Sequence, residues 1–112
     1  MSVVGRFAPS PTGPLHLGSL VAAAGSWLFA RAAGGRWLVR MEDLDTPRVV
    51  PGADRAILDA LRRYGLEWDG EVVYQSQRIA RYESALSALR AQGVVFDCAC
   101  SRAELQRAAS AP

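Results

Sequence analysis

Short apolar runs along the chain alternate with longer segments in which apolar residues recur at helical spacing. The short runs predict strands at residues 3–8, 36–41, 71–75 and 94–98. The longer segments predict helices at residues 18–33, 51–65, 79–93 and from Ser101 onward. Ser101 and Glu104 have the spacing of a capping box, which marks the start of the last helix. Because strand and helix alternate, we expect an α/β fold with a parallel sheet covered by helices.

The apolar residues of each predicted helix indicate which of its sides packs on the sheet. In the first helix they are Leu20, Val21, Ala24, Leu28 and Ala32. In the second they are Ile57, Leu58, Leu61 and Tyr64, and in the third Ile79, Tyr82, Leu86 and Leu89. Residues 42–51, between the second strand and the second helix, are charged and predict a loop.

Length and composition fit one folded catalytic or binding domain. The chain has 112 residues, of which 50% are hydrophobic and 21% charged, enough for one core of modest size. This apolar content excludes a disordered chain. The sequence has no apolar run of the roughly 18 residues that a membrane span needs, and its start lacks the apolar stretch of a secretory signal. We therefore expect a cytoplasmic protein that does not bind membranes.

The absence of lysine and the presence of a single histidine exclude several kinds of active site. All 13 basic residues are arginine, which excludes a P-loop lysine and a Schiff-base lysine within this chain. His16 is the single histidine, so a site with two histidine ligands is excluded as well. A net charge of +2 argues against an extended basic clamp for nucleic acid but permits a local arginine patch.

The turn from the first strand into the first helix, residues 8–19, is a candidate anion site. Ligands of parallel α/β sheets bind beyond the carboxyl ends of the strands, where a helix N-terminus offers free N–H groups to a phosphate. Gly18 lets the backbone approach such a group, and His16 can donate a hydrogen bond to it. The alternative is a rigid proline-rich turn with a surface histidine.

Two charged features flank this turn. Arg6 lies in an otherwise apolar strand, where it is expected to need a partner, either Asp43 or Asp45 of the chain or a substrate carboxylate. Glu42 follows the second strand and is suited to accept hydrogen bonds from a substrate ammonium group. The alternative for the acidic segment at 42–45 is a solvated loop that pairs with Arg40 and Arg48.

Cys98 and Cys100 are a further candidate site. They are too close in sequence for a favourable disulfide, but thiolates at this spacing can hold two corners of a tetrahedral zinc site. No other cysteine is present, so the alternatives are an incomplete zinc site or two inert thiols.

Taken together, these segments carry a resemblance to a known family. Residues 5–18, GRFAPSPTGPLHLG, closely resemble the signature of glutamyl-tRNA synthetases, with residues 16–19 as the class I "HIGH" element. Residues 37–53, 68–71 and 75–78 resemble the truncated branch of that family that acts on queuosine in tRNA(Asp). The resemblance covers residues 5 to about 104.

This resemblance implies a Rossmann-like catalytic domain of the class I aminoacyl-tRNA synthetases, which activates L-glutamate with ATP and Mg²⁺ and transfers it to queuosine in the anticodon of tRNA(Asp). The implied glutamate site comprises Arg6, Phe7, Ala8, Pro9, Ser10 and Glu42. The implied ATP site comprises Pro9, Ser10, Pro11, Thr12, Gly13, His16, Gly18 and Ser19. Within it, His16 and Gly18 would act at the reacting phosphates. Cys98 and Cys100 would be the first two Zn²⁺ ligands.

The departures from the family pattern indicate which parts of such an enzyme this sequence contains. Ser19 replaces the second histidine of the general class I motif, and Thr46 replaces a usual proline. The lysine-bearing "KMSKS"-like loop and the later zinc ligands are missing from this sequence. We therefore expect residues 1–95 to form the N-terminal half of the catalytic domain and residues 96–112 to begin a small zinc-binding insertion, without full activity alone.

Three alternatives remain open at this point. A glutamyl-tRNA synthetase that charges tRNA(Glu) would share most of these motifs. A non-catalytic remnant that binds tRNA or a partner would explain the missing lysine loop. A metal-dependent nucleotide-sugar transferase is suggested only by the spacing of Asp43 and Asp45.

Overall fold

The computed structural model describes residues 2–110 and divides into two compact units, residues 2–79 and 80–110. In chain order its elements are β1 (Val4–Phe7), α1 (Leu17–Ala32), β2 (Arg36–Met41), the 3₁₀ helix η1 (Thr46–Arg48), α2 (Ala53–Arg63), β3 (Val73–Tyr74), the 3₁₀ helix η2 (Gln75–Arg78), α3 (Ile79–Ala91) and α4 (Arg102–Ala109). The predicted α/β class is confirmed. The expected start of an insertion at residue 96 stays a prediction.

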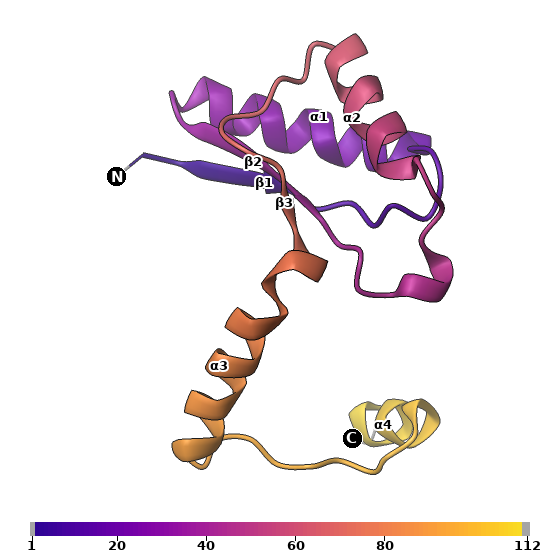
Figure 1. Cartoon of the computed structure of the whole chain (residues 1–112), viewed down its shortest axis with the longest axis vertical. Helices are drawn as coiled ribbons and strands as arrows, with labels where there is room; N and C mark the ends of the chain where they lie inside the picture. Colours follow the sequence, from indigo (N-terminus) through magenta and orange to yellow (C-terminus); the bar gives the residue numbers. More distant parts are fainter. Residues whose placement is uncertain (1, 111–112) are drawn as a thin grey trace. The chain divides into compact units, whose positions relative to one another are not determined.

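The first unit is a three-stranded parallel sheet in the order β1-β2-β3. Val4 of β1 pairs with Arg36 of β2, and Phe7 pairs with Val39. The end of β2 pairs with β3. Both crossovers move in the same direction across the sheet, so right-handed connections bring α1 and α2 to one face, as Figure 1 shows. The opposite face of the sheet is left without a helix from residues 2–79.

The core lies between the sheet and these two helices. Its buried members share that face and are Phe7, Ala23, Ala30, Trp37, Val39, Met41, Ile57, Leu61 and Leu66. Trp37 is fully buried, stacks on Phe7 and donates its indole N–H to the Ser26 hydroxyl at 2.9 Å. A Cβ on Gly5 would come within 3.1 Å of Ala30, so glycine allows α1 to lie this close to β1.

A polar network fastens the loop after α2 to α1 and β2. Asp69 accepts the backbone N–H of Trp37 and a guanidinium N–H of Arg31, both at 2.7 Å. Trp27 and Arg31 both donate to the carbonyl of Glu67 at 2.9 Å. The hydrogen bond from the Trp37 amide, followed by that from Arg31, holds the pKa of Asp69 below its usual value.

Several sequence predictions need correction. Residues 94–98 form no strand: they have no neighbouring strand to pair with in the described chain, and Phe96 is 84% exposed. The predicted strand at 71–75 shortens to β3, and the helix predicted from residue 51 begins at Ala53. The capping box is confirmed, because Ser101 and Glu104 exchange both of its hydrogen bonds.

The predicted buried faces of the helices are only partly correct. Ile57 and Leu61 of α2 are buried, whereas Tyr64 is 65% exposed. In α1 the buried residues are Ala23 and Ala30, while three predicted core residues are exposed, Val21, Leu28 and Ala32. The four apolar residues predicted for the core side of α3 are also exposed: Ile79, Tyr82, Leu86 and Leu89. Apolar residues surround α1, so periodicity alone does not select the side that meets the sheet.

Candidate active site

The loop from β1 to α1 is fixed by backbone hydrogen bonds to two neighbouring segments. The N–H of Glu42 donates to the Pro9 carbonyl at 2.9 Å, and the N–H of Val50 donates to the Pro11 carbonyl at 3.0 Å. Proline restricts φ, so these contacts and the prolines together give the loop one conformation. Pro11 is buried beneath the loop and does not line the cavity that the loop helps to form.

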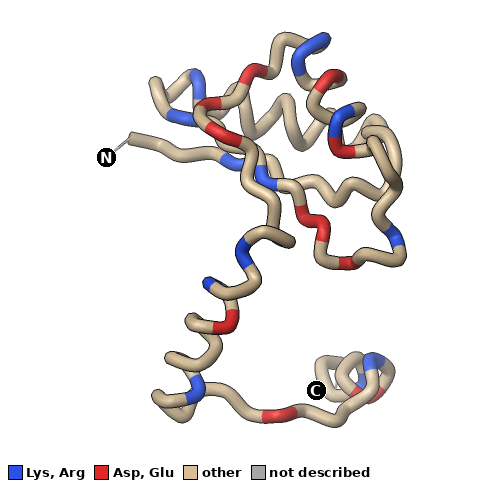
Figure 2. Tube along the Cα trace, in the orientation of Figure 1, with Lys and Arg blue, Asp and Glu red and all other residues tan. Residues whose placement is uncertain are grey.

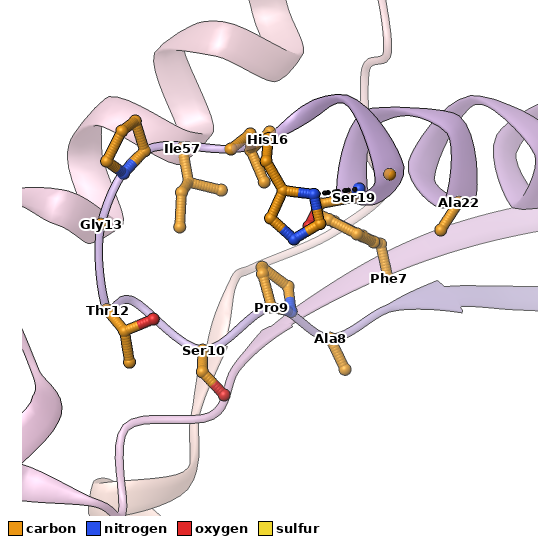
Figure 3. Close-up of a pocket in the computed structure, with 13 residues that line it drawn as sticks. Phe7, Ala8, Pro9, Ser10, Thr12, Gly13, His16, Ser19, Ala22 and Ile57 are labelled. Carbon is orange, nitrogen blue, oxygen red and sulfur yellow. Dashed lines mark hydrogen bonds between the residues drawn. The ribbon is translucent and has the colours of Figure 1, made fainter.

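This loop and the start of α1 enclose a cavity of about 660 Å³, a size typical of small-molecule sites (Figure 3). Its walls are Phe7, Ala8, Pro9, Ser10, Thr12, Gly13, Pro14, Leu15, His16, Gly18, Ser19, Ala22 and Ile57. Most residues of the predicted ATP site thus surround one cavity at the carboxyl end of β1. Ala22 and Ile57 were not predicted, since their spacing shows only that they lie on helices.

His16 and the N-terminus of α1 supply the polar end of the cavity. His16 is the N-cap of α1, and its Nδ1 accepts the backbone N–H of Ser19 at 3.2 Å. The first turn of α1 has no acidic residue, so nothing within that turn opposes the partial positive charge of the helix end. An anionic group is the ligand best suited to this position.

Arg6 and Glu42 lie outside the lining of this cavity. Phe7 faces the core, so its neighbour Arg6 faces the opposite, open side of the sheet. The expectation that Arg6 needs a partner because of burial was wrong: the side chain is exposed, and within residues 2–110 it forms no ion pair. It is therefore free to bind a ligand carboxylate.

The acidic segment after β2 has partners within the chain. Glu42 pairs with Arg40 at 2.7 Å, and Asp45 pairs with Arg48 at 3.5 Å, as the solvated-loop alternative expects. Asp43 accepts hydrogen bonds from the hydroxyl and the N–H of Ser76. Partial burial acts to raise the pKa of Asp43, but these hydrogen bonds outweigh it, and the pKa lies below its usual value. The alternative in which Arg6 pairs with Asp43 or Asp45 is not found.

Charges of both signs are interspersed along the trace in Figure 2, with no long basic run between residues 2 and 110. Cys98 and Cys100 are both exposed and unbonded. Across the described residues, no group of three or more histidine, cysteine or acidic side chains could hold a metal ion. The two thiols present are thus too few for a tetrahedral zinc site, and the zinc assignment stays a prediction.

The comparisons with known proteins agree with this arrangement. A family model described as "tRNA synthetases class I (E and Q), catalytic domain" matches residues 2–111. The chain belongs to this family. The Rossmann-like fold expected from the sequence motifs is thereby confirmed.

Two curated relatives have the same name. The "Glutamyl-Q tRNA(Asp) synthetase" of Thiobacillus denitrificans is 68% identical over 105 residues, covering 94% of this chain and 35% of the relative. That of Geobacter sulfurreducens is 61% identical over 110 residues, covering 98% and 35%. The chain therefore spans about a third of the length of these curated relatives.

A solved structure supports the fold independently. A glutamate tRNA ligase from Elizabethkingia meningosepticum, crystallised in complex with its amino acid, superposes with a TM-score of 0.79 at 35% identity. The match covers 96% of this chain and 23% of that one. No helix among residues 2–110 is long and apolar enough to cross a membrane.

Proposed function

We propose that this chain provides the part of a class I synthetase that binds ATP and L-glutamate for formation of glutamyl-adenylate. The observation that supports the proposal is the cavity at the N-terminus of α1, which is lined by His16, Ser19 and the loop from β1 to α1 and is suited to an anion. In the reaction, a glutamate carboxylate oxygen bonds to the α-phosphorus of ATP and pyrophosphate leaves. ATP would enter with Mg²⁺, which shields its phosphate charge.

Each group has a role that follows from its position. Hydrogen-bond donors at the cavity, His16 and the first N–H groups of α1, would stabilise charge that grows on the departing phosphates. The exposed guanidinium of Arg6 would grip the side-chain carboxylate of glutamate through two parallel hydrogen bonds. Glu42 would accept hydrogen bonds from the ammonium group of glutamate. Its ion pair with Arg40 holds its carboxylate in place before the substrate binds.

The second step of the proposal is transfer of glutamate to queuosine in the anticodon of tRNA(Asp). Its support is the name shared by the curated relatives. Charging of tRNA(Glu) is the competing function, and the solved glutamate tRNA ligase of similar fold favours it. Either substrate is found in the cytoplasm, where we expect the protein to act. A zinc site that uses Cys98 and Cys100 would need ligands from other residues.

Two assays on the longest natural gene product that contains this chain test the proposal. Glutamate-dependent exchange between ATP and pyrophosphate tests adenylation, and its absence would favour a non-catalytic remnant. Transfer of labelled glutamate to tRNA(Asp) with queuosine, compared with tRNA(Asp) without queuosine and with tRNA(Glu), tests the acceptor. Transfer to tRNA(Glu) alone would reject the queuosine function while retaining adenylation.

A matched pair of variants connects these assays to the cavity. His16→Ala should lower the exchange rate more than the affinity for ATP, because its donor acts on charge that develops during the reaction. Ser110→Ala, far along the sequence in the cap of α4, should leave the rate unchanged. Equal rates for both variants would remove His16 from the proposed chemistry.

A further inference from the structure

We propose that Gly18 and Ser19 are positioning residues for His16, holding its ring as the neutral tautomer with the proton on Nε2 and that N–H at the cavity. The role of this N–H toward a phosphate rests on the proposed function. The geometry that sets the tautomer does not, because it involves only contacts among His16, Gly18 and Ser19.

Two contacts with Ser19 specify the tautomer. The backbone N–H of Ser19 lies 3.2 Å from Nδ1 of His16, and a backbone N–H can only donate. Nδ1 must therefore carry a lone pair, which leaves the proton of the neutral ring on Nε2. The hydroxyl oxygen of Ser19 lies 3.0 Å from Nε2 and can accept this proton in a hydrogen bond. Figure 3 shows the His16 ring beside Ser19, with the hydrogen bond dashed.

The absence of a side chain on Gly18 leaves room for the ring in this position. A Cβ built on Gly18 would lie 3.1 Å from Cε1 and 3.2 Å from Nδ1 of His16. These separations are shorter than ordinary van der Waals contacts, so a side chain here would require the ring to shift by a few tenths of an ångström relative to Ser19. A Cβ on Gly25, in the same helix, would meet no atom within 4 Å.

This arrangement prepares His16 for an anion. Many functional histidines are oriented by a carboxylate, whereas the Nδ1 of His16 is held by the helix backbone. The Nε2 proton is then the single donor of the ring, and a phosphate oxygen in the cavity can replace the Ser19 hydroxyl as its acceptor. One hydrogen bond replaces another, so the ring enters the bound state without a change of tautomer. This exchange limits the cost of ordering the side chain on binding.

Nuclear magnetic resonance of the full 112-residue chain tests the proposal directly. His16 is the only histidine, so ¹⁵N-histidine labelling yields one imidazole spectrum. At a pH where the ring is neutral, the ¹⁵N shifts distinguish a protonated from a bare nitrogen, and water exchange of the Nε2 proton reports its hydrogen bond. We expect a bare Nδ1, a protonated Nε2 and slowed exchange. A protonated Nδ1 would overturn the proposal.

Matched variants separate the two contacts. Gly18→Ala should mix the tautomers while Gly25→Ala leaves them unchanged, since only the first added methyl reaches the ring. Ser19→Ala should speed exchange of the Nε2 proton, and Ser19→Thr, which keeps a hydroxyl, should slow it again. Alanine favours helix, so α1 should persist in the alanine variants, and backbone amide spectra confirm this. Identical spectra for Gly18→Ala and Gly25→Ala, or for Ser19→Ala and wild type, would refute the positioning role.

Titration with inorganic pyrophosphate separates this inference from the proposed function. If pyrophosphate shifts the His16 resonances, we expect Ser19→Ala to bind it about two- to tenfold more tightly, because pyrophosphate then no longer has to displace the hydrogen bond between Nε2 and the Ser19 hydroxyl. Equal affinity of both proteins would reject the exchange of one acceptor for the other. If His16 has the expected tautomer but its resonances do not respond to pyrophosphate, the positioning role is retained and the phosphate site is rejected.

Discussion

Arg6 provides the sharpest test of the glutamate site, because its removal should change binding without changing stability. The side chain is exposed on the open face of the sheet and forms no ion pair or hydrogen bond within the described residues. Arg6→Ala should therefore change the free energy of unfolding by no more than about 0.5 kcal/mol, as is usual for surface substitutions.

The effect on binding follows from the proposed contact. A charge-assisted hydrogen-bonded contact contributes roughly 1.5–3 kcal/mol. At about 1.4 kcal/mol per tenfold change, Arg6→Ala should weaken glutamate binding roughly 10- to 150-fold. ATP affinity should change less than about twofold, because Arg6 does not line the cavity beside His16.

Isothermal titration calorimetry with each ligand, on the longest natural gene product containing the chain, measures both affinities. Arg36→Ala is the matched control: Arg36 is an exposed arginine on the neighbouring strand, in register with Val4, and it lies outside the cavity lining. It has the same charge change as Arg6→Ala. Equal losses of glutamate affinity in both variants would show a general electrostatic effect, and equal losses of glutamate and ATP affinity in Arg6→Ala would show a structural role.

Three other predictions concern stability and metal binding. Leu61→Ala, at a fully buried core position, should lower the free energy of unfolding by about 2–5 kcal/mol in urea denaturation. Leu28→Ala, at a position that is 60% exposed, should lower it by less than about 1 kcal/mol. Similar losses in both variants would contradict the assignment of Leu61 to the core. Because the pKa of Asp69 is lowered on folding, its contribution to stability is present above about pH 4 and is lost as the pH falls further. Asp69→Asn should reduce this acid dependence of the free energy of unfolding, measured by denaturation between about pH 7 and pH 2. The same pH dependence in the variant and the wild type would refute this role of Asp69. Zinc should bind weakly to this chain through Cys98 and Cys100, and tight stoichiometric zinc after dialysis would show ligands other than those recognised.

Local sequence signals were sufficient where the structure depends on neighbouring residues. The second strand was predicted at its observed bounds, because polar residues and glycines delimit a short apolar run. The capping box at Ser101 was predicted because its two hydrogen bonds span only three residues. His16 and Gly18 were predicted to lie together at a helix N-terminus because the proline-rich turn directly precedes that helix.

Other features depend on pairing between distant segments, and these were predicted poorly. Residues 94–98 have strand composition, yet a strand requires a partner, which the described chain does not offer them. The hydrogen bonds of Ser76 to Asp43 join residues 33 positions apart, a separation at which periodicity carries no signal. Arg6 was expected to be buried because its neighbours are apolar, but alternation along β1 places it on the uncovered face.

The sequence by itself determined the order of strands and helices, the parallel sheet and the proline-rich turn before the first helix, because these follow from local spacing and from the right-handed connection of parallel strands. The tertiary structure decided which side of α1 is buried, which side chains share the cavity and which charges remain unpaired. These outcomes depend on what covers each face of the sheet and on how closely two elements approach. At Gly5, for example, the lack of a side chain leaves room for Ala30 of α1. Such contacts arise only when distant segments pack together.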